Sequence, residues 1–227
     1  MTGELILVLA FIGLLILISF MADKSNKKKI IFFGDSITQA GLLLKGYITV
    51  MKHILHQQGI ENYDLIGAGT GGNKVYDLYL RLDEDVLSKS PYIVVIYIGV
   101  NDVWHKKTHG TGTDPGTFEN FYRAIISKLH INGAKVIMCT PAVIGERKDY
   151  GNEMDDDLNK YCNIIRNMAA SLKVPLVDLR KAFTDYEAAN NTANADKEIL
   201  TTDGVHLNDA GNVMVAGLMW NVIKDVK

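Results

Sequence analysis

Short, uninterrupted apolar runs alternate with helical patterns along most of this chain of 227 residues, and this alternation restricts the fold more than any other feature. The runs are rich in isoleucine and valine, which is typical of strands buried on both faces of a parallel sheet. Between them, apolar residues recur every three or four positions, and a last helix is predicted from about Asn208, its N-cap, to Val226. Five strands alternating with helices predict a three-layer α/β fold with right-handed crossovers. The strands are expected at residues 29–33, 63–66, 92–98, 135–139 and 176–178.

Unusual residues follow four of the five predicted strands. In parallel α/β sheets, ligands bind beyond the carboxyl ends of the strands. The sequence therefore predicts one functional site at one edge of the sheet. The segments concerned are GDS at 34–36, GAGTGGN at 67–73, GVNDVWH at 99–105 and TTDGVHLND at 201–209.

These segments contain every group that acyl transfer to a serine requires. Ser36 is the candidate nucleophile, His206 the base, and Asp203 the group that orients the imidazole. The turn DGVH is short enough to bring both side chains to one side. The backbone N–H groups of Ser36 and Gly72, with the side-chain amide of Asn101, are the candidate oxyanion donors. A glycine suits position 72 because a substrate approaching the backbone leaves little room for a Cβ atom.

In this order, GDSITQ, the glycine of GTGGN, GVND and DGVH resemble the four signature blocks of the SGNH hydrolases, also called GDSL esterases and lipases. The resemblance covers residues 30–220. It implies a flavodoxin-like α/β/α sandwich with five parallel strands, the same roles for the five residues above, and no metal or other cofactor. Ile37 stands where the family name has leucine, at a position that packs and does not react. Gly71 lies beside Gly72, so the register of the oxyanion glycine stays open by one residue.

Each candidate residue also has an ordinary structural interpretation. A serine after a strand is commonly a helix N-cap, Asp-Gly is a common turn pair, and Asn101 could cap a loop. Asp35 is expected to bond local backbone donors and not to take part in the reaction. The functional interpretation is favoured because the candidates occur together at the strand ends.

Residues 67–72 also fit the dinucleotide fingerprint G-x-G-x-x-G. The fingerprint here follows the second strand, and the next strand ends without the acidic residue that would bind the ribose. Nucleotide binding is therefore the weaker hypothesis. A non-catalytic carbohydrate-binding domain of the same fold is a further alternative, although every catalytic position is filled.

The segment 105–117, HKKTHGTGTDPGT, is predicted to be a mobile loop on the substrate side. His105, His109 and Asp114 suggest a metal, but their spacing is not that of a metal site. Trp104 either lines a pocket near Asn101 or packs in the interior.

The N-terminus carries 17 uncharged residues, 5–21, at the short limit for a membrane span. A cleaved signal peptide normally has basic residues before the apolar stretch and small residues before the cleavage site, whereas Phe20 precedes the best site here. We predict a membrane anchor at 1–22, with a signal peptide as the alternative. A basic linker at 23–29 and the catalytic domain at 30–227 are expected to follow.

Four lysines follow the apolar stretch and none precedes it. The positive-inside rule then keeps the catalytic domain in the cytoplasm, while a cleaved segment makes the protein secreted or periplasmic. The side of the membrane is left open.

The formal net charge is −2, from 24 basic and 26 acidic residues, so no basic excess points to nucleic acid as a partner. The two cysteines, Cys139 and Cys162, are too few for a disulfide framework and are expected to be buried free thiols.

The predicted reaction is hydrolysis of a carboxylic ester through an acyl-serine intermediate. If the chain leaves the membrane at the amino end of the first strand, about six residues at roughly 3.3 Å each place Ser36 some 20 Å away. This distance favours a small-molecule or glycan ester, with a short acyl group such as acetyl on carbohydrate. A lysophospholipase or thioesterase is the alternative within the family.

Overall fold

The computed structural model describes residue 12 and residues 27–149 and 151–226. The predicted anchor, apart from residue 12, and residues 23–26 of the predicted linker lie outside the described residues. No helix within the described part of the chain is long and apolar enough to cross a membrane. The first strand begins at Lys28, inside the range expected for the linker.

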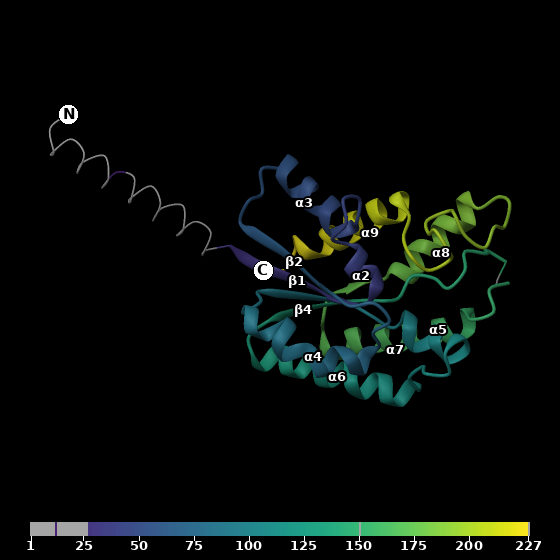
Figure 1. Ribbon diagram of the computed structural model, residues 1–227, viewed down its shortest axis with the longest axis horizontal. Helices are drawn as coiled ribbons and strands as arrows, with labels where there is room; N and C mark the ends of the chain where they lie inside the picture. Colours follow the sequence, from purple (N-terminus) through teal and green to yellow (C-terminus); the bar gives the residue numbers. More distant parts are fainter. Residues whose placement is uncertain (1–11, 13–26, 150, 227) are drawn as a thin grey trace.

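Five parallel strands form one sheet, as predicted, in the order β2-β1-β3-β4-β5 (Figure 1). Gly34, the last residue of β1, pairs with Gly69 of β2 on one side and with Tyr97 of β3 on the other. Three neighbouring strands therefore end level, and the segments that follow them start side by side. The strands are β1 (Lys28–Gly34), β2 (Tyr63–Gly69), β3 (Ile93–Tyr97), β4 (Lys135–Cys139) and β5 (Leu176–Val177).

Helices cover both faces of the sheet and complete the three-layer α/β/α fold (Figure 1). One layer holds α2 (Ser36–Ala40), α3 (Tyr47–Gln57), α8 (Leu179–Asn190) and α9 (Asp209–Ile223). The other layer holds α4 (Val75–Asp85), the short 3₁₀ helix Leu87–Lys89, α5 (Val100–Thr108), α6 (Pro115–Ile131) and α7 (Asp155–Leu172).

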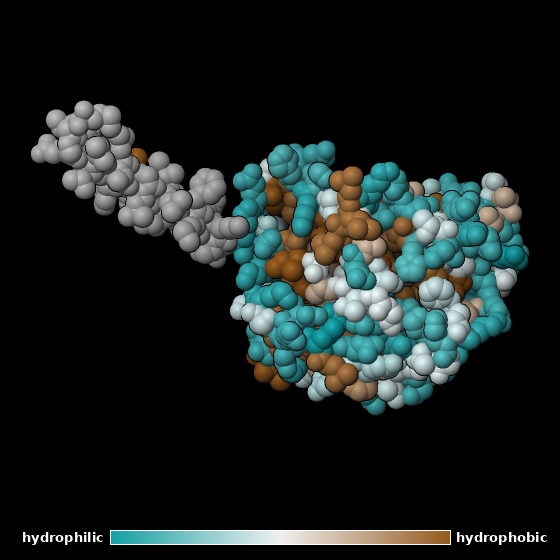
Figure 2. Space-filling view, viewed as in Figure 1, coloured by the Kyte–Doolittle hydropathy of each residue, from teal (hydrophilic) through white to brown (hydrophobic). Residues whose placement is uncertain are grey.

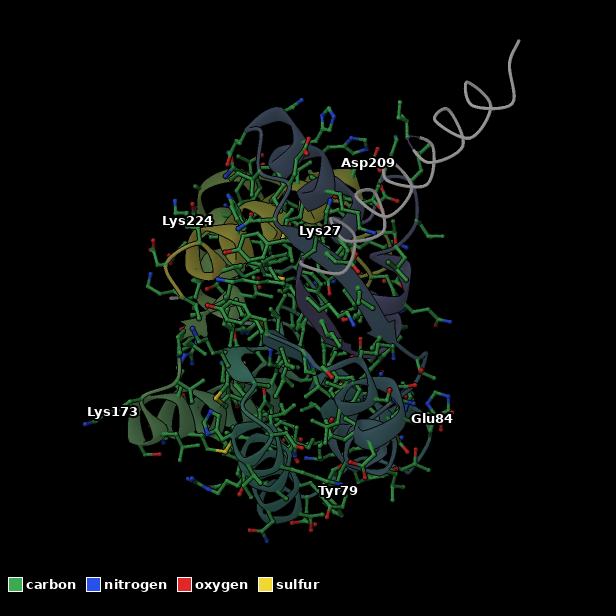
Figure 3. All side chains as sticks on the ribbon, turned by 90° about the vertical axis from the view of Figure 1, so that its left-hand side faces the viewer. Lys27, Tyr79, Glu84, Lys173, Asp209 and Lys224 are labelled. Atoms are coloured by element: carbon green, nitrogen blue, oxygen red, sulfur yellow. The ribbon has the colours of Figure 1, made fainter. Side chains whose placement is uncertain are left out.

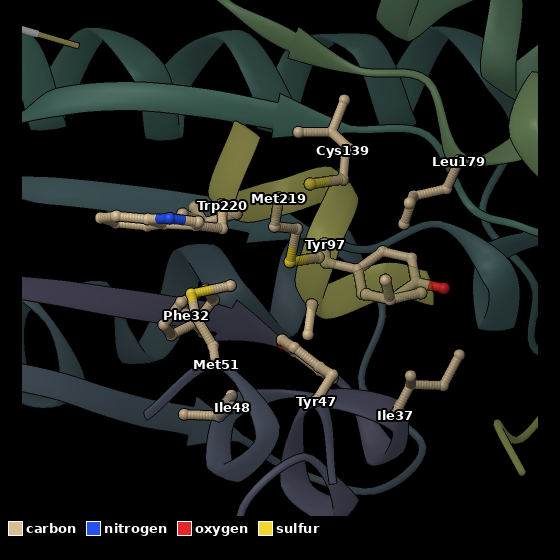
Figure 4. Close-up of a cluster of buried hydrophobic side chains, with 14 of the residues drawn as sticks. Phe32, Ile37, Tyr47, Ile48, Met51, Tyr97, Cys139, Leu179, Met219 and Trp220 are labelled. Atoms are coloured by element: carbon tan, nitrogen blue, oxygen red, sulfur yellow. The ribbon is translucent and has the colours of Figure 1, made fainter. Parts of the chain in front are cut away.

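The strands are apolar throughout because the two helix layers create two cores. Ile30 and Phe32 of β1 face the core under α3 and α9, while Ile31 and Phe33 face the core under α4 and α6. Full burial of one such side chain stabilises the fold by roughly 1.5–3 kcal/mol. Figure 4 shows the first core, in which Met219 and Trp220 of α9 lie near β3 and Phe32.

Three α-helices of the structure, α2, α5 and α8, were not predicted from the spacing. Helix α8 follows β5 directly and is capped by Asp178, which accepts the N–H of Lys181 at 3.2 Å. Its buried face includes the apolar residues Leu179 and Phe183. Two apolar residues are too few to reveal a helical period in an otherwise polar segment. Helix α5 occupies the start of the predicted loop 105–117 and α6 its end, so the prediction of a loop is wrong for residues 105–108 and 115–117.

Polar residues cover most of the face seen in Figure 2, as is usual for a surface in contact with water. In Figure 3 the labelled Lys173 and Glu84 lie at the edges of the view, while the interior between the layers is filled by side chains. The sheet and its two cores thus form a rigid support for the segments that begin at its carboxyl edge.

Candidate active site

Ser36 is the first residue of α2, and only Asp35 separates it from β1. Asp35 is the N-cap of this helix, and its Oδ1 accepts the N–H of Ile37 at 3.0 Å. This is the local backbone bond that the sequence predicts for Asp35. Its carboxyl group is buried, and burial raises the pKa of Asp35 to about 7, with Asp102 adding to the rise. The cap determines where α2 starts and therefore how Ser36 leaves the sheet.

A continuous chain of hydrogen bonds joins Ser36 to the turn before α9. Ser36 Oγ lies 2.9 Å from His206 Nε2, and His206 Nδ1 lies 2.8 Å from Asp203 Oδ2. A carboxylate only accepts hydrogen bonds, so Nδ1 carries the proton and Nε2 can accept the hydroxyl proton of Ser36. The structure thus brings Ser36 to a histidine 170 positions away in sequence, and the three residues have the geometry of a nucleophile, a base and an orienting acid.

The carboxylate of Asp203 also organises its own turn. Its Oδ1 accepts the backbone N–H groups of Val205 at 3.0 Å and His206 at 2.8 Å. Burial by itself would raise the pKa of Asp203, but the hydrogen bonds from the backbone and ring of His206 hold it below its ordinary value. Asp203 therefore stays ionised and keeps the imidazole in one tautomer over a wide pH range.

A buried carboxylate that sequence reasoning missed supports the segment that carries His206. Glu146 is fully buried, and its two oxygens accept the N–H groups of Ile199 at 2.9 Å and Leu200 at 2.6 Å. Next to it, the N–H of Gly145 donates to the carbonyl of Gly204 at 2.8 Å. The loop after β4 therefore holds the segment before the DGVH turn and the turn itself at Gly204. No local motif marks Glu146, because its partners are about 50 residues away in sequence.

Three candidate oxyanion donors lie at the ends of β1, β2 and β3. The N–H of Ser36 has no partner in its own helix, because it belongs to the first residue of α2. The side-chain amide of Asn101, near the start of α5, donates one hydrogen to the carbonyl of Asn73 at 3.1 Å. An amide carries two hydrogens, so the second is left for a ligand.

The hydrogen bonds around the glycine block distinguish the two possible registers. The N–H of Gly71 donates to the side chain of Gln39 at 3.0 Å. The N–H of Gly72 forms no hydrogen bond with another described residue. Gly72 also has a φ of +74°, a conformation that side chains disfavour. The geometry therefore favours Gly72 over Gly71 as the donor.

Asp102 is a second buried acid near the site. It accepts the N–H of Val75 at 3.2 Å and so ties the start of α4 to the start of α5. Burial raises its pKa to about 6. Sequence reasoning did not single out this residue. Asp102 follows Asn101 directly, and its bond to α4 helps to hold the start of α5, which carries Asn101.

The central glycine of the dinucleotide fingerprint, Gly69, serves the packing of the fold. A Cβ atom at Gly69 would lie 2.1 Å from the backbone nitrogen of Gln39, so α2 could not approach β2 as closely. This close approach accounts for that glycine without a bound nucleotide.

The three residues that suggested a metal, His105, His109 and Asp114, do not form a cluster. The rings of His105 and His109 lie 4.3 Å apart, but Asp114 caps α6 by accepting the N–H of Thr117. Across residues 27–149 and 151–226, no group of three or more histidine, cysteine or acidic side chains is arranged to hold a metal.

Trp104 lines a cavity, one of the two alternatives predicted for it. The cavity has a volume of about 400 Å³ and lies beside Asp203, under the segments 144–154 and 203–205. The rings of Trp104 and His206 are 6.2 Å apart. A pocket of this size is in the range of small-ligand sites.

A family model described as the GDSL-like Lipase/Acylhydrolase family matches residues 32–213. The chain belongs to this family. It is therefore a hydrolase that acts on esters, as the sequence predicts, and the GDSL fold agrees with the five-stranded parallel sheet.

Two of the similar proteins are acetyl xylan esterases, and a third is a lipoprotein. A crystal structure titled as an acetyl xylan esterase, AlAXEase, is 57% identical, has a TM-score of 0.85, and covers 86% of this chain and 99% of its own. The acetylxylan esterase of Geobacillus stearothermophilus is 28% identical over 83% of this chain and 90% of that protein. An uncharacterized lipoprotein of Bacillus subtilis, YqeF, is 25% identical over 87% and 90%.

Proposed function

We propose that this protein is a serine esterase that removes acetyl groups from a xylan-type carbohydrate. The observation that carries the proposal is the 57% identity to an acetyl xylan esterase over nearly the whole length of that chain. The hydrogen-bonded series Ser36–His206–Asp203 supplies the chemistry that the reaction needs. A lipase or thioesterase of the same family is the competing activity, and acyl-chain preference distinguishes it.

In the proposed mechanism, His206 removes the proton of Ser36 as its oxygen attacks the acetyl carbonyl. The tetrahedral intermediate collapses when His206 gives that proton to the sugar oxygen, which leaves as an alcohol. Water then attacks the acetyl-serine, again with His206 as the base, and acetate is released. Asp203 remains ionised throughout and stabilises the imidazolium that forms in each step.

The negative charge on the carbonyl oxygen is proposed to be bound by Ser36 N–H, Gly72 N–H and the amide of Asn101. Donors aimed at this oxygen before the reaction begins lower the barrier, because they need no rearrangement when the charge develops. They come from the ends of three adjacent strands, whose register keeps their spacing constant.

Asn101→Ala tests this role. We expect turnover to fall about 10²–10³-fold, as is usual when one oxyanion donor is removed. The Michaelis constant is expected to change little, because the charge exists only in the transition state. Circular dichroism serves as the control for folding, since the amide also bonds to Asn73. A folded variant with near-normal turnover would remove Asn101 from the oxyanion site.

The function itself is tested by acetate release from acetylated xylan and by hydrolysis of p-nitrophenyl acetate, butyrate and octanoate. We expect activity that declines steeply with acyl length and vanishes in Ser36→Ala and His206→Ala. A preference for octanoate would favour the lipase alternative. A folded wild-type protein with no esterase activity on any of these substrates would overturn the proposal.

We propose further that residues 1–22 anchor the protein in a membrane or direct its export, and that 23–29 link them to the catalytic domain. Support comes from the apolar sequence of residues 5–21 and from the similarity to a lipoprotein. Fractionation of cells that express the full chain tests this. Full-length protein in the soluble fraction of the cytoplasm would contradict it.

A further inference from the structure

The cavity beside Asp203 has no assigned role in the mechanism above. Its walls come from the loop after β4, from α5 and from the turn that carries the orienting acid. The side chains that matter for recognition are those of Trp104, Arg147, Asn152, Glu153, Asp196 and Asp203.

The position of the cavity relates it to the leaving group of the ester. His206 gives its proton to the alcohol oxygen, so the alcohol half of the ester must lie on the imidazole side of Ser36. Trp104 lies on that side, with its ring inclined at 68° to the ring of His206. Asp203 contacts the imidazole and also lines the cavity. The cavity is therefore adjacent to the place where the alcohol is released.

Two polar side chains at the cavity are available to a ligand. Asn152 is engaged in its own loop, where it bonds to the backbone of Arg147, and Glu153 pairs with Lys107. By contrast, the side chains of Arg147 and Asp196 form no hydrogen bond or ion pair with any other described residue. One is a donor of several hydrogen bonds and the other an acceptor, a combination that suits hydroxyl groups.

The charges around the cavity restrict the ligand further. Three carboxylates, those of Glu153, Asp196 and Asp203, line it together with one arginine. A phosphate or a uronate would be repelled by these carboxylates. A long acyl chain offers no hydrogen-bonding group to Arg147 and Asp196, so these two exposed side chains would add nothing to its binding. A neutral sugar satisfies both groups and also offers an apolar ring face, whose C–H groups match the negative face of an indole.

We propose that this cavity is the subsite for the sugar ring of the leaving alcohol, a neutral pyranose. Trp104 packs against the apolar face of the ring, while Arg147 and Asp196 bind its hydroxyl groups. The inference rests on the proposed function, since it assumes that the alcohol half of the substrate is a carbohydrate.

Tryptophan fluorescence can test the subsite without turnover. The chain has two tryptophans, and Trp220 is buried in the core under α9 (Figure 4). Full-length Ser36→Ala is titrated with xylobiose, and a change in emission is expected from Trp104. Arg147→Ala in the same background is expected to weaken binding about tenfold or more, the usual effect of losing a hydrogen bond to a charged group. No emission change and no binding by calorimetry would overturn the subsite.

A matched control and a charged ligand make the test specific. Lys148 is the neighbour of Arg147, is exposed, and lines a different cavity, so Lys148→Ala should bind xylobiose as the parent does. Glucuronate should bind more weakly than xylose. Equal loss of xylobiose binding in both variants, or preferred binding of glucuronate, would contradict the proposal.

Kinetics separate this inference from the proposed function. Arg147→Ala and Asp196→Ala should lower kcat/KM for acetylated xylobiose more than for p-nitrophenyl acetate. An unchanged ratio of the two values, with wild-type esterase activity intact, would overturn the subsite and leave the esterase. Absence of esterase activity in the wild type, with xylobiose still bound, would overturn the esterase and leave the sugar site.

Discussion

Asp203 shows how one side chain can set the protonation state of another. One of its oxygens holds the turn through two backbone N–H groups, and the other accepts from His206 Nδ1. Because the two oxygens have separate partners, an amide at this position would keep the turn and change only the contact with the imidazole.

Asp203→Asn is therefore expected to fold normally and to lose about 10³–10⁴ in turnover. The amide oxygen can replace Oδ1 at the backbone, and the NH₂ group then faces Nδ1 of His206. Nδ1 must become the acceptor, so Nε2 carries the proton and can no longer take one from Ser36. Burst kinetics with p-nitrophenyl acetate measure the acylation step. Asp209→Asn, an exposed change at the start of α9, is the control. Unchanged acylation would remove Asp203 from the proposed triad.

Asp35 gives a prediction about pH and stability. Its pKa is about 7 in the folded protein and about 3.8 ordinarily, so between these values the folded state holds a proton that the unfolded chain has lost. The free energy of unfolding then falls as pH rises through this range, by up to about 1.4 kcal/mol per pH unit. Below this range both states are protonated and the loss disappears.

Asp35→Asn keeps the oxygen that accepts from Ile37 but cannot ionise. We expect the Tm of this variant, relative to wild type, to rise between about pH 4 and pH 7 and to level off above. Thermal unfolding at several pH values measures the difference. A difference that stays constant over this range would show that Asp35 does not titrate as described.

At the scale of elements, the loop after β4 and the segment before α9 depend on each other. The loop has no regular secondary structure, and nor does the segment from Ala195 to Leu200. Glu146 joins the two through the backbone N–H groups of Ile199 and Leu200. The loop also supplies Arg147 and Asn152 to the cavity beside Asp203. The catalytic turn and the proposed sugar subsite thus share one support.

Glu146→Gln tests this support. The amide can accept only at one oxygen, so one buried N–H, of Ile199 or Leu200, loses its partner, at a cost of about 1–3 kcal/mol. We expect lower thermal stability and a lower kcat, with a smaller effect on the Michaelis constant, because His206 is less well positioned. Glu61→Gln, an exposed change before β2 and away from the site, is the control for loss of a charge. A stable variant with normal kcat would show that Glu146 does not position the turn.

At the scale of the whole molecule, each of the two cores contains one cysteine, whose reactivity measures how well that core excludes solvent. Cys139 lies in the core under α3 and α9, and Cys162 lies in the core under α4 and α6. Burial raises the pKa of both thiols, that of Cys162 to about 12. Both are free and buried, as the sequence predicts.

We expect iodoacetamide to leave both thiols unmodified in the native protein and to label both after denaturation. Thiolates are the reactive form, and neither access nor ionisation is available in the folded state. Cys139→Ala and Cys162→Ala assign each label by mass spectrometry. Rapid labelling of one cysteine under native conditions would show that its core opens without global unfolding.

The sequence by itself determined the class of the fold and the place of the site. Strands buried on both faces must be apolar without interruption, which made the β1, β2, β3 and β4 runs visible. Ser36 and Asn101 stood out because polar residues soon after such a strand are conspicuous. His206 stood out because it follows Asp203 and Gly204 in a short turn before the last helix. Helix α8 was missed because its apolar face is short, and α5 because its glycine and polar start resemble a loop.

Only the tertiary structure decided the strand order and the register that aligns Gly34, Gly69 and Tyr97. Its hydrogen bonds favour Gly72 over Gly71 as the proposed donor. The support from Glu146 and the cavity beside Trp104 also became visible only there. These features depend on contacts between residues that lie far apart in the chain. Periodicity and motifs record what a residue needs from its near neighbours, whereas contacts across the sheet are settled when the whole core packs.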